Sequence, residues 1–151
     1  MKRYVLGFCF NMRLDQVVLI QKTRPEWQAG RLNGVGGHIE NGETPPEAMA
    51  REFREEADWT DLLDWRCFGC LHGAGWEVFL FYARNNVVPS PFNKSPEGIV
   101  SAHHVCCVLG QETSKGARPL PNLRYLIPMA INHSTGEDCA EFFDIAETVA
   151  P

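Results

Sequence analysis

Three glutamates, Glu52, Glu55 and Glu56, follow one another at helical spacing. At about 100° per residue, positions i, i+3 and i+4 of a helix share one arc of its surface. Such a cluster is most often solvated, and Glu47, Arg51 and Glu55 are spaced for an ordinary i, i+4 ladder. Glu52 and Glu56, however, have no basic residue three or four positions away. They repel each other by roughly 0.2–0.5 kcal/mol, a penalty that a bound cation would remove.

A glycine-rich turn precedes these glutamates and offers a second type of ligand. Gly36 and Gly37 are adjacent, so a backbone carbonyl can approach an ion or a phosphate closely. Mg2+ prefers carboxylate and carbonyl oxygens, and it keeps several waters while it bridges to substrate phosphates. On its own the turn is equally consistent with a plain loop. Together with the glutamates it predicts a Mg2+ site, with Mn2+ as the alternative ion.

The helix that must carry the glutamates is the clearest element of the sequence. Thr44 suits the N-cap, Pro45 suits the first helical position, and Glu47 completes a Thr-x-x-Glu capping box, so a helix is predicted over 44–59. Its apolar side should face a sheet. That side consists of Pro46, Met49, Ala50, Phe53 and Ala57.

The rest of the chain reads mainly as strands and loops. Five apolar segments are predicted as strands, namely 4–10, 16–21, 63–72, 77–84 and 103–109. Loops are expected over 23–37, where a very short strand follows the exposed part, over 85–98 and over 111–121. A second helix is expected over 123–132. This order predicts an α/β fold in which a mixed sheet is packed between helices.

Length and composition narrow the class of protein. The chain has 151 residues and a formal net charge of -5, so one domain over 1–151 is expected. With 44% hydrophobic and 11% aromatic residues, global disorder is excluded. The acidic balance argues against binding a nucleic-acid polymer through a broad basic face. No apolar stretch approaches the ~20 residues of a membrane span, and no full signal peptide is recognised, so a cytoplasmic protein without membrane contact is expected.

The six cysteines would stay reduced in that compartment. Cys67 and Cys70 form a CxxC, for which zinc binding is the alternative to buried thiols. The segment reads as a strand, on which residues three apart point to opposite faces, and no second CxxC exists. Buried or half-buried thiols are therefore expected.

The segment from Gly37 to Trp59 resembles the Nudix box, the signature of the Nudix hydrolases. Gly37 is followed after five residues by Glu43 and after seven more by Arg51-Glu52-Phe53-Arg54-Glu55-Glu56-Ala57-Asp58-Trp59. Every defined position of the family pattern fits except one, because Asp58 stands where glycine is usual. Glycine acts there as a left-handed helix cap, and Asp tolerates that conformation better than most residues. A local cost and an intact site are expected.

The resemblance, which runs to about Pro128, implies an α/β/α sandwich. It also implies a set of metal ligands: the backbone carbonyl near Gly36 or Gly37 and the carboxylates of Glu52, Glu55 and Glu56. It implies an orienting salt bridge between Glu43 and Arg51, and it leaves general base as an alternative role for Glu52. Glu97 is the candidate for a fourth acid from outside the box, the alternative being an ordinary exposed loop residue.

The implied activity is Mg2+-dependent hydrolysis of a nucleoside diphosphate-linked small molecule, in first place a nucleoside triphosphate split to the monophosphate and pyrophosphate. A pyrophosphatase of ADP-ribose or nucleotide sugars is the alternative, and a non-catalytic nucleotide-binding module is a third. The last has no chemical need for three unneutralised carboxylates. A homodimer is compatible with the resemblance.

Segment 24–37 is similar to the corresponding part of the MutT-like oxidised-purine nucleoside triphosphatases. That similarity implies Asn33 as a partner of the base and Trp27 as an aromatic wall, against structural roles as turn former and loop anchor. Arg24 and Arg31 flank this loop and would contact phosphates or be solvated. Those enzymes place two aspartates before the late helix, where this chain has Asn122 and then Leu123. Asn122 can donate and accept, so another base or a permissive pocket fits as well as an oxidised purine.

Overall fold

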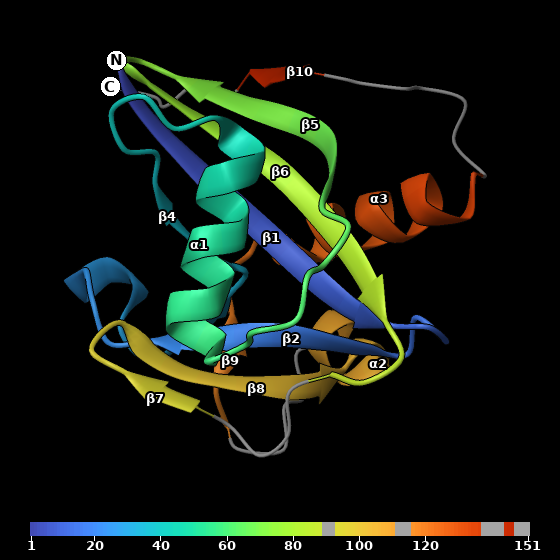
Figure 1. The fold of residues 1–151 in the computed structure, drawn as a ribbon. Helices are drawn as coiled ribbons and strands as arrows, with labels where there is room; N and C mark the ends of the chain where they lie inside the picture. The colour runs from blue at the N-terminus through green and yellow to red at the C-terminus, as the bar shows by residue number, and fades with distance from the viewer. Residues whose placement is uncertain (89–92, 111–115, 137–143, 147–151) are drawn as a thin grey trace.

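The fold is organised around strand β1 (Lys2–Asn11), which lies in the middle of a mixed sheet (Figure 1). The computed structural model describes residues 1–88, 93–110, 116–136 and 144–146. Along one edge, β1 pairs in parallel with β6 (Trp76–Asn85) over its whole length. Along the other edge its partner changes from β4 (Val35–His38) to β2 (Gln16–Lys22), both antiparallel. β4 and β2 therefore diverge from a shared edge.

Further strands extend this centre on both sides. Beyond β6 lie β5 (Arg66–Gly73), antiparallel to it, and β10 (Asp144–Ala146), parallel to β5. On the other side, β2 pairs antiparallel with β8 (Gly98–His104) and with β3 (Arg31–Asn33). β8 pairs in turn with β7 (Asn93–Ser95), and β3 pairs with β9 (Arg118–Pro119).

In the described part of the chain, three α-helices flank the sheet: α1 (Pro45–Ala57) on one face, and α2 (Val105–Leu109) and α3 (Leu123–Thr135) on the other. Alternation along β1 supplies both cores, because successive side chains of a strand point to opposite faces. Val5 and Cys9 pack in the core under α1, whereas Phe8 and Phe10 pack in the core under α3. Phe53 of α1 is 2% exposed, and its burial contributes roughly 1.5–3 kcal/mol. The predicted α/β/α sandwich with a mixed sheet is confirmed.

The prediction of a strand over 103–109 is wrong. β8 ends at His104, and the short helix α2 begins at Val105. Val105 and Val108 lie three residues apart and are both buried, while Cys106 between them is exposed. An apolar run this short fits a buried strand and a buried helical turn equally well, so periodicity alone did not separate the two.

Other boundaries differ by a few residues. α1 ends at Ala57, two residues before the predicted end, and α3 continues past the predicted end through Thr135, with Pro128 inside it. The expected loop 23–37 contains the short 3-10 helix η1 (Glu26–Gln28) and two strands, and the expected loop 85–98 contains β7. Parts of the expected loops, 89–92 and 111–115, lie outside the described residues. None of the helices in the described part of the chain is long and apolar enough to cross a membrane.

The CxxC segment carries a β-bulge between Cys67 and Gly69. In the β5–β6 ladder Cys67 stands opposite Phe81 and Cys70 opposite Phe79. Those two phenylalanines are two residues apart on β6, so they share one face of the sheet. The expectation that the two cysteines point to opposite faces is therefore wrong, because a bulge inserts one extra residue and restores the same side.

Candidate functional site

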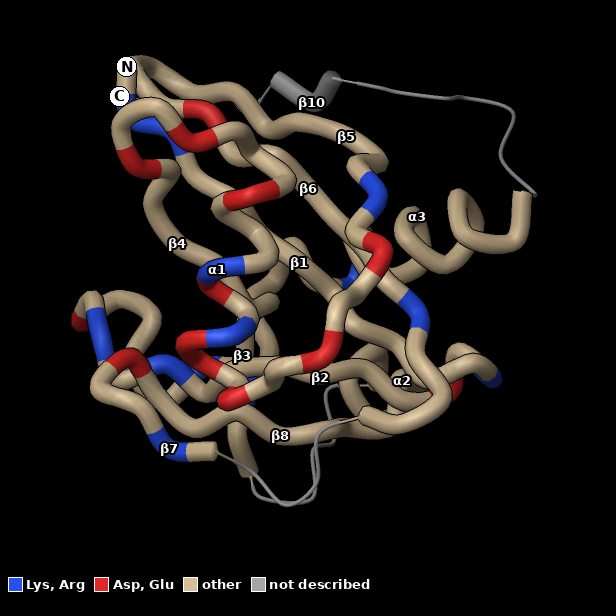
Figure 2. The backbone as a smooth tube through the Cα atoms, viewed as in Figure 1, with Lys and Arg blue, Asp and Glu red and all other residues tan. Residues whose placement is uncertain are grey.

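Helix α1 is fixed at both ends by the residues that the sequence suggested. The Glu47 carboxylate accepts hydrogen bonds from the Thr44 backbone N–H at 2.9 Å and from its hydroxyl at 2.7 Å. At the other end Asp58 adopts the left-handed conformation, with φ 51° and ψ 42°. The helix thus stops directly after the acidic cluster, and Figure 2 shows basic and acidic positions following one another along it.

Glu56 is the most deeply buried charged residue among those described, at 3% exposure. Its Oε2 accepts a long hydrogen bond of 3.4 Å from the Gly36 N–H, and its Oε1 is buried with no hydrogen-bond partner among the described residues. Desolvation raises the pKa of Glu56 to about 7, although the charge of Lys22 acts in the opposite direction. A buried carboxylate oxygen without a donor costs free energy unless a proton or a cation occupies it.

The two glycines of the turn are required by close approach. A Cβ on Gly36 would lie 2.0 Å from the carbonyl oxygen of Val5, and a Cβ on Gly37 would lie 2.5 Å from the carboxylate carbon of Glu52. Glu52 therefore rests directly against the glycine backbone. Burial raises the pKa of Glu52, and its hydrogen bond from Arg51 only partly offsets that effect.

Arg51 links the turn to the acidic cluster. Its Nε and Nη2 donate to the two oxygens of Glu43 at 2.8 and 3.0 Å, and Nη2 also donates to the carbonyl of His38 at 2.9 Å. Its Nη1 reaches Glu52 at 2.8 Å and Glu55 at 3.4 Å. This arginine lowers the pKa of Glu43 and keeps it ionised. Glu52 and Glu55 thus share one nitrogen, while Glu56 turns to Gly36.

The acidic side chains do not converge on one point. Among the described residues, three carboxylate, imidazole or thiol ligand atoms come within 4.8 Å of one another only in a different group, on the β5–β6 hairpin. Glu55 is 60% exposed and lies at the rim of the site, whereas the side chain of Glu52 is 14% exposed. In this arrangement Arg51 binds Glu52 and Glu55, and Glu56 lies apart from them.

For the hydrolysis that the resemblance to the Nudix box implies, we expect Arg51→Lys to lower kcat/KM by about 10–100-fold, because lysine cannot bind both oxygens of Glu43 and reach Glu52 at the same time. The fold should persist, since the fork lies at the surface of α1. Steady-state hydrolysis and the thermal midpoint of both proteins test this. Wild-type kcat/KM in the lysine variant would show that the fork has no orienting role.

Glu97 lies across a cavity of about 500 Å3 from the glutamates of α1. Arg24 forms a close ion pair with Glu97 Oε1, and Lys22 Nζ lies 3.5 Å from Oε2. These cations lower the pKa of Glu97. The cavity is lined by both cations, by Glu52, Glu55, Glu56 and Glu97, and by the turn at Gly36 and Gly37. Lys22 was not singled out in the sequence. It is the last residue of a buried strand, and none of its sequence neighbours indicates that its side chain would line a cavity.

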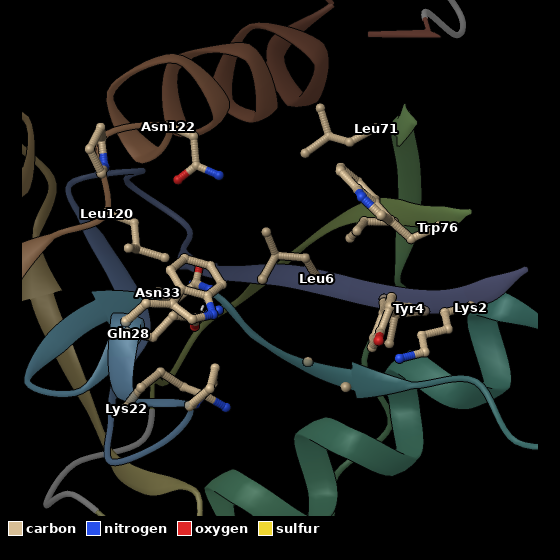
Figure 3. A pocket seen from close by; sticks show the side chains of 18 of the residues that line it. Lys2, Tyr4, Leu6, Lys22, Gln28, Asn33, Leu71, Trp76, Leu120 and Asn122 are labelled. Atoms are coloured by element: carbon tan, nitrogen blue, oxygen red, sulfur yellow. Dashed lines mark hydrogen bonds between the residues drawn. The ribbon is translucent and has the colours of Figure 1, made fainter. Parts of the chain in front are cut away.

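A second cavity of about 930 Å3 adjoins the first, with Lys22, Gly36 and Gly37 in the wall of both (Figure 3). It brings together Trp27, Asn33 and Asn122, three of the residues singled out in the sequence. Leu123, by contrast, is fully buried in the core. Arg31 is exposed on β3 and lines neither cavity.

The far end of the larger cavity is formed by a residue that was not singled out in the sequence. Trp76 lines it and packs over Gly73, where an added Cβ would lie 2.0 Å from the indole ring. Figure 3 shows Trp76 on the opposite side of the cavity from Asn33. A lone tryptophan in a strand is usually a core residue, so the sequence held no signal for this position.

In the metal-free protein, we expect the free energy of unfolding to fall as the pH rises from about 4.5 to about 7. The pKa of Glu56 is about 7 when folded, above the ordinary carboxyl value near 4.3, so in this window the folded state keeps a proton that the unfolded state has lost. The loss is at most roughly 4 kcal/mol. Glu43 and Glu97 have lowered pKa values, so they act in the opposite sense and at lower pH.

Urea unfolding in the presence of a chelator, over the range from about pH 5 to pH 8, measures this slope. Glu56→Gln has no proton to lose, so its stability should be flatter across the window. Equal slopes in the two proteins would contradict the assignment of the titration to Glu56.

A family model of the NUDIX domain matches residues 2–117. Among solved structures, MutT from Bacillus halodurans is 20% identical, with 98% of this chain and 91% of that chain covered and a TM-score of 0.65. The NUDIX domain of Shewanella oneidensis NrtR, complexed with ADP ribose, is 14% identical, with 87% of each chain covered and a TM-score of 0.68. A NUDIX-family hydrolase from Clostridium perfringens is 20% identical, with 91% and 98% covered and a TM-score of 0.62.

No curated protein sequence matches the chain. At identities this low the structural likeness establishes the fold, and the family follows from the domain match over most of the chain. The chain belongs to the Nudix family.

Proposed function

We propose that the protein hydrolyses a nucleoside triphosphate to the nucleoside monophosphate and pyrophosphate with Mg2+ beside α1. The observation that carries the proposal is Glu56 Oε1, a buried oxygen without a hydrogen-bond partner among the described residues. It belongs to a cavity that also holds Glu52 and the glycine turn. Oxygen donors of this kind suit a hard divalent cation such as Mg2+, and Mn2+ is the alternative ion.

The residues present fit such an ion. We assign the carboxylates of Glu52, Glu55 and Glu56 and a carbonyl at Gly36 or Gly37 as its ligands, with Glu97 as a fourth acid. In the metal-free state, cations of the protein pair with three of these four carboxylates: Arg51 with Glu52 and Glu55, and Lys22 and Arg24 with Glu97. Desolvation raises the pKa of the fourth, Glu56, to about 7, so below that pH a proton occupies the place that the ion would take.

When bound, the ion supplies charge neutralisation and a coordinated water of lowered pKa. The protein supplies position. Arg51, fixed by Glu43, holds the Glu52 carboxylate at the cavity wall, where it serves as a ligand or takes the proton of the attacking water. Lys22 and Arg24 line the same cavity and are placed to bind phosphate oxygens through charge-assisted hydrogen bonds.

The larger cavity is the proposed site of the base. Trp27 is 68% exposed, so its indole is available for stacking. Asn33 accepts from the Gly34 N–H at 2.8 Å and donates to Gln28 at 3.3 Å, so its amide is oriented before a ligand arrives. Asn122 lies at the start of α3 and presents both a donor and an acceptor.

An ADP-ribose-like substrate is the second candidate, because the cavity extends beyond Asn33 to Trp76 (Figure 3). Its volume is near the upper end for small-molecule sites, which leaves space for a second group after the base. The NUDIX domain of NrtR, with a similar fold, is complexed with ADP ribose.

A panel of nucleoside triphosphates, ADP-ribose and nucleotide sugars, assayed with and without Mg2+, tests the proposal. Pyrophosphate release from a triphosphate, dependent on the ion, is the expected result. Release of two monophosphates from ADP-ribose, with no pyrophosphate from any triphosphate, would favour the second candidate. Tight binding of a nucleotide without turnover, with Mg2+ or with Mn2+, would overturn both candidate activities and identify a binding module.

A further inference from the structure

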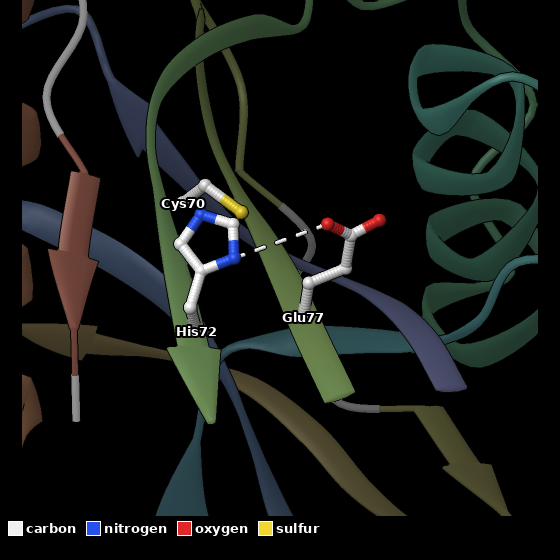
Figure 4. Close-up of side chains that lie close together, drawn as sticks. All are labelled: Cys70, His72 and Glu77. Carbon is white, nitrogen blue, oxygen red and sulfur yellow. Dashed lines mark ion pairs between the residues drawn. The ribbon is translucent and has the colours of Figure 1, made fainter. Parts of the chain in front are cut away.

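Three side chains with metal-binding atoms gather on the β5–β6 hairpin, and none of them lines either cavity (Figure 4). Cys70 and His72 come from β5 and Glu77 from β6. One ligand atom of each, the sulfur, a ring nitrogen and a carboxylate oxygen, lies within 4.8 Å of the other two. Thiol, imidazole and carboxylate therefore meet at one place on the sheet.

Strand geometry produces this convergence. Cys70 and His72 are two residues apart, so both point to the same face. His72 stands directly opposite Glu77 in the β5–β6 ladder, and cross-strand pairs of this kind have neighbouring Cβ atoms. Leu71 points to the other face, where it lines the larger cavity. The cluster and the cavity thus occupy opposite faces of one hairpin.

Glu77 is oriented by a partner outside the cluster. Arg3 Nε donates to Glu77 Oε1 at 2.6 Å, and the Arg3 guanidinium lies 5.2 Å from the centroid of the Phe79 ring. The other oxygen, Oε2, is turned toward His72, 3.9 Å from Nδ1. Carboxylates that bind metals are commonly held in this way, with one oxygen hydrogen-bonded and the other directed at the ion.

The donor set differs in kind from that of α1. Thiolate and imidazole ligands suit borderline-soft Zn2+, whereas Mg2+ requires oxygen. One thiolate and one carboxylate balance the charge of a divalent ion. Three protein ligands leave a fourth tetrahedral position for water or another group. Cys70 is 2% exposed and the side chain of Glu77 is 17% exposed, so water competes little for these two donors.

We propose that Cys70, His72 and Glu77 form a Zn2+ site that is separate from the hydrolytic centre. Binding releases the thiol proton, because sulfur coordinates as the thiolate. The ion would join β5 to β6 and, through Glu77 and Arg3, to the first strand of the sheet. The proposal rests on these residues alone and stands whether or not the protein cleaves nucleotides.

Titration of the metal-free full-length chain with Co2+ tests the site. Four-coordinate Co2+ with a thiolate ligand gives a sulfur-to-metal charge-transfer band in the near ultraviolet and intense visible bands, and added Zn2+ should bleach both. We expect one bound ion per chain with these bands. Saturating Co2+ without a charge-transfer band would overturn the proposal.

Variants identify the ligands. Cys70→Ser should abolish the charge-transfer band, and His72→Gln, at a half-exposed position with little effect on folding, should weaken Co2+ binding at least tenfold. Cys67→Ser, which removes the neighbouring thiol on the same face, is the matched control and should keep the band. A band that survives in Cys70→Ser, or that disappears only in Cys67→Ser or Cys106→Ser, would place the metal elsewhere. Glu56→Gln should keep the band, which separates this site from the proposed function.

Discussion

Replacing Glu56 with glutamine should lower kcat about 1,000-fold or more while the fold is retained. Glutamine has the same shape, but it lacks the charge that a divalent ion would neutralise at this position. The fold should tolerate the change because Oε1 has no hydrogen-bond partner among the described residues and the carboxylate carries a desolvation penalty. The metal-free variant should even gain stability at neutral pH. Turnover of the best substrate, metal affinity by calorimetry and the unfolding midpoint measure these effects.

Glu40→Gln is the matched control, since it makes the same chemical change at an exposed glutamate in the loop before α1. It should leave both kcat and metal affinity unchanged. If Glu56→Gln turned over at the wild-type rate, the assignment of the site to this carboxylate would be wrong. An equal loss in both variants would point to the overall charge of the region instead.

Gly36→Ala should destabilise the protein by about 3 kcal/mol or more, the largest effect on stability that we expect from a single methyl group. The new Cβ would lie 2.0 Å from the carbonyl oxygen of Val5, and that atom belongs to backbone that cannot move without breaking the β1–β4 ladder. Urea unfolding measures the loss. Soluble variant protein should also have weaker metal binding, because Gly36 N–H faces Glu56.

Gly110→Ala is the control for an added methyl group. Gly110 has φ -76° and ψ -5° at the end of α2, and its nearest contact for a Cβ is 3.1 Å, to the Cys106 carbonyl oxygen. The effect should stay within about 1 kcal/mol of zero, because alanine adopts this backbone conformation without strain and the 3.1 Å contact offsets the gain. Similar losses at both glycines would mean that the close approach at Gly36 does not control stability.

Local chemistry made part of this molecule predictable. The capping residues Thr44 and Glu47 and the left-handed Asp58 act within a few residues of their own positions, so the limits of α1 follow from the sequence to within two residues. Interactions between residues that lie this close in the sequence can be predicted from residue type and spacing. The ion pair of Glu43 and Arg51, by contrast, was expected only from the resemblance to the Nudix box, and the structure contains it.

Features that depend on distant strands were not predictable in the same way. The bulge at Cys67 follows from the register of β5 against β6, and the strand assigned to 103–109 failed because burial came from α3 and not from a neighbouring strand. Lys22 meets Glu97 across 75 positions of sequence. A single sequence carries no signal for such a pairing until the fold has brought the two segments together.

The divided edge of β1 has a consequence for which substitutions the two cavities of this protein can accept. Helix α1, which follows β4, presents the carboxylates, whereas the wall of the larger cavity comes largely from β1, from the loop before β3, from the β5–β6 turn and from the start of α3. The two cavities share Lys22, Gly36 and Gly37 in their walls, but Trp27, Trp76 and Asn122 line the larger one alone. Substitutions at these three positions can therefore reshape the larger cavity while the carboxylates of α1 stay in place.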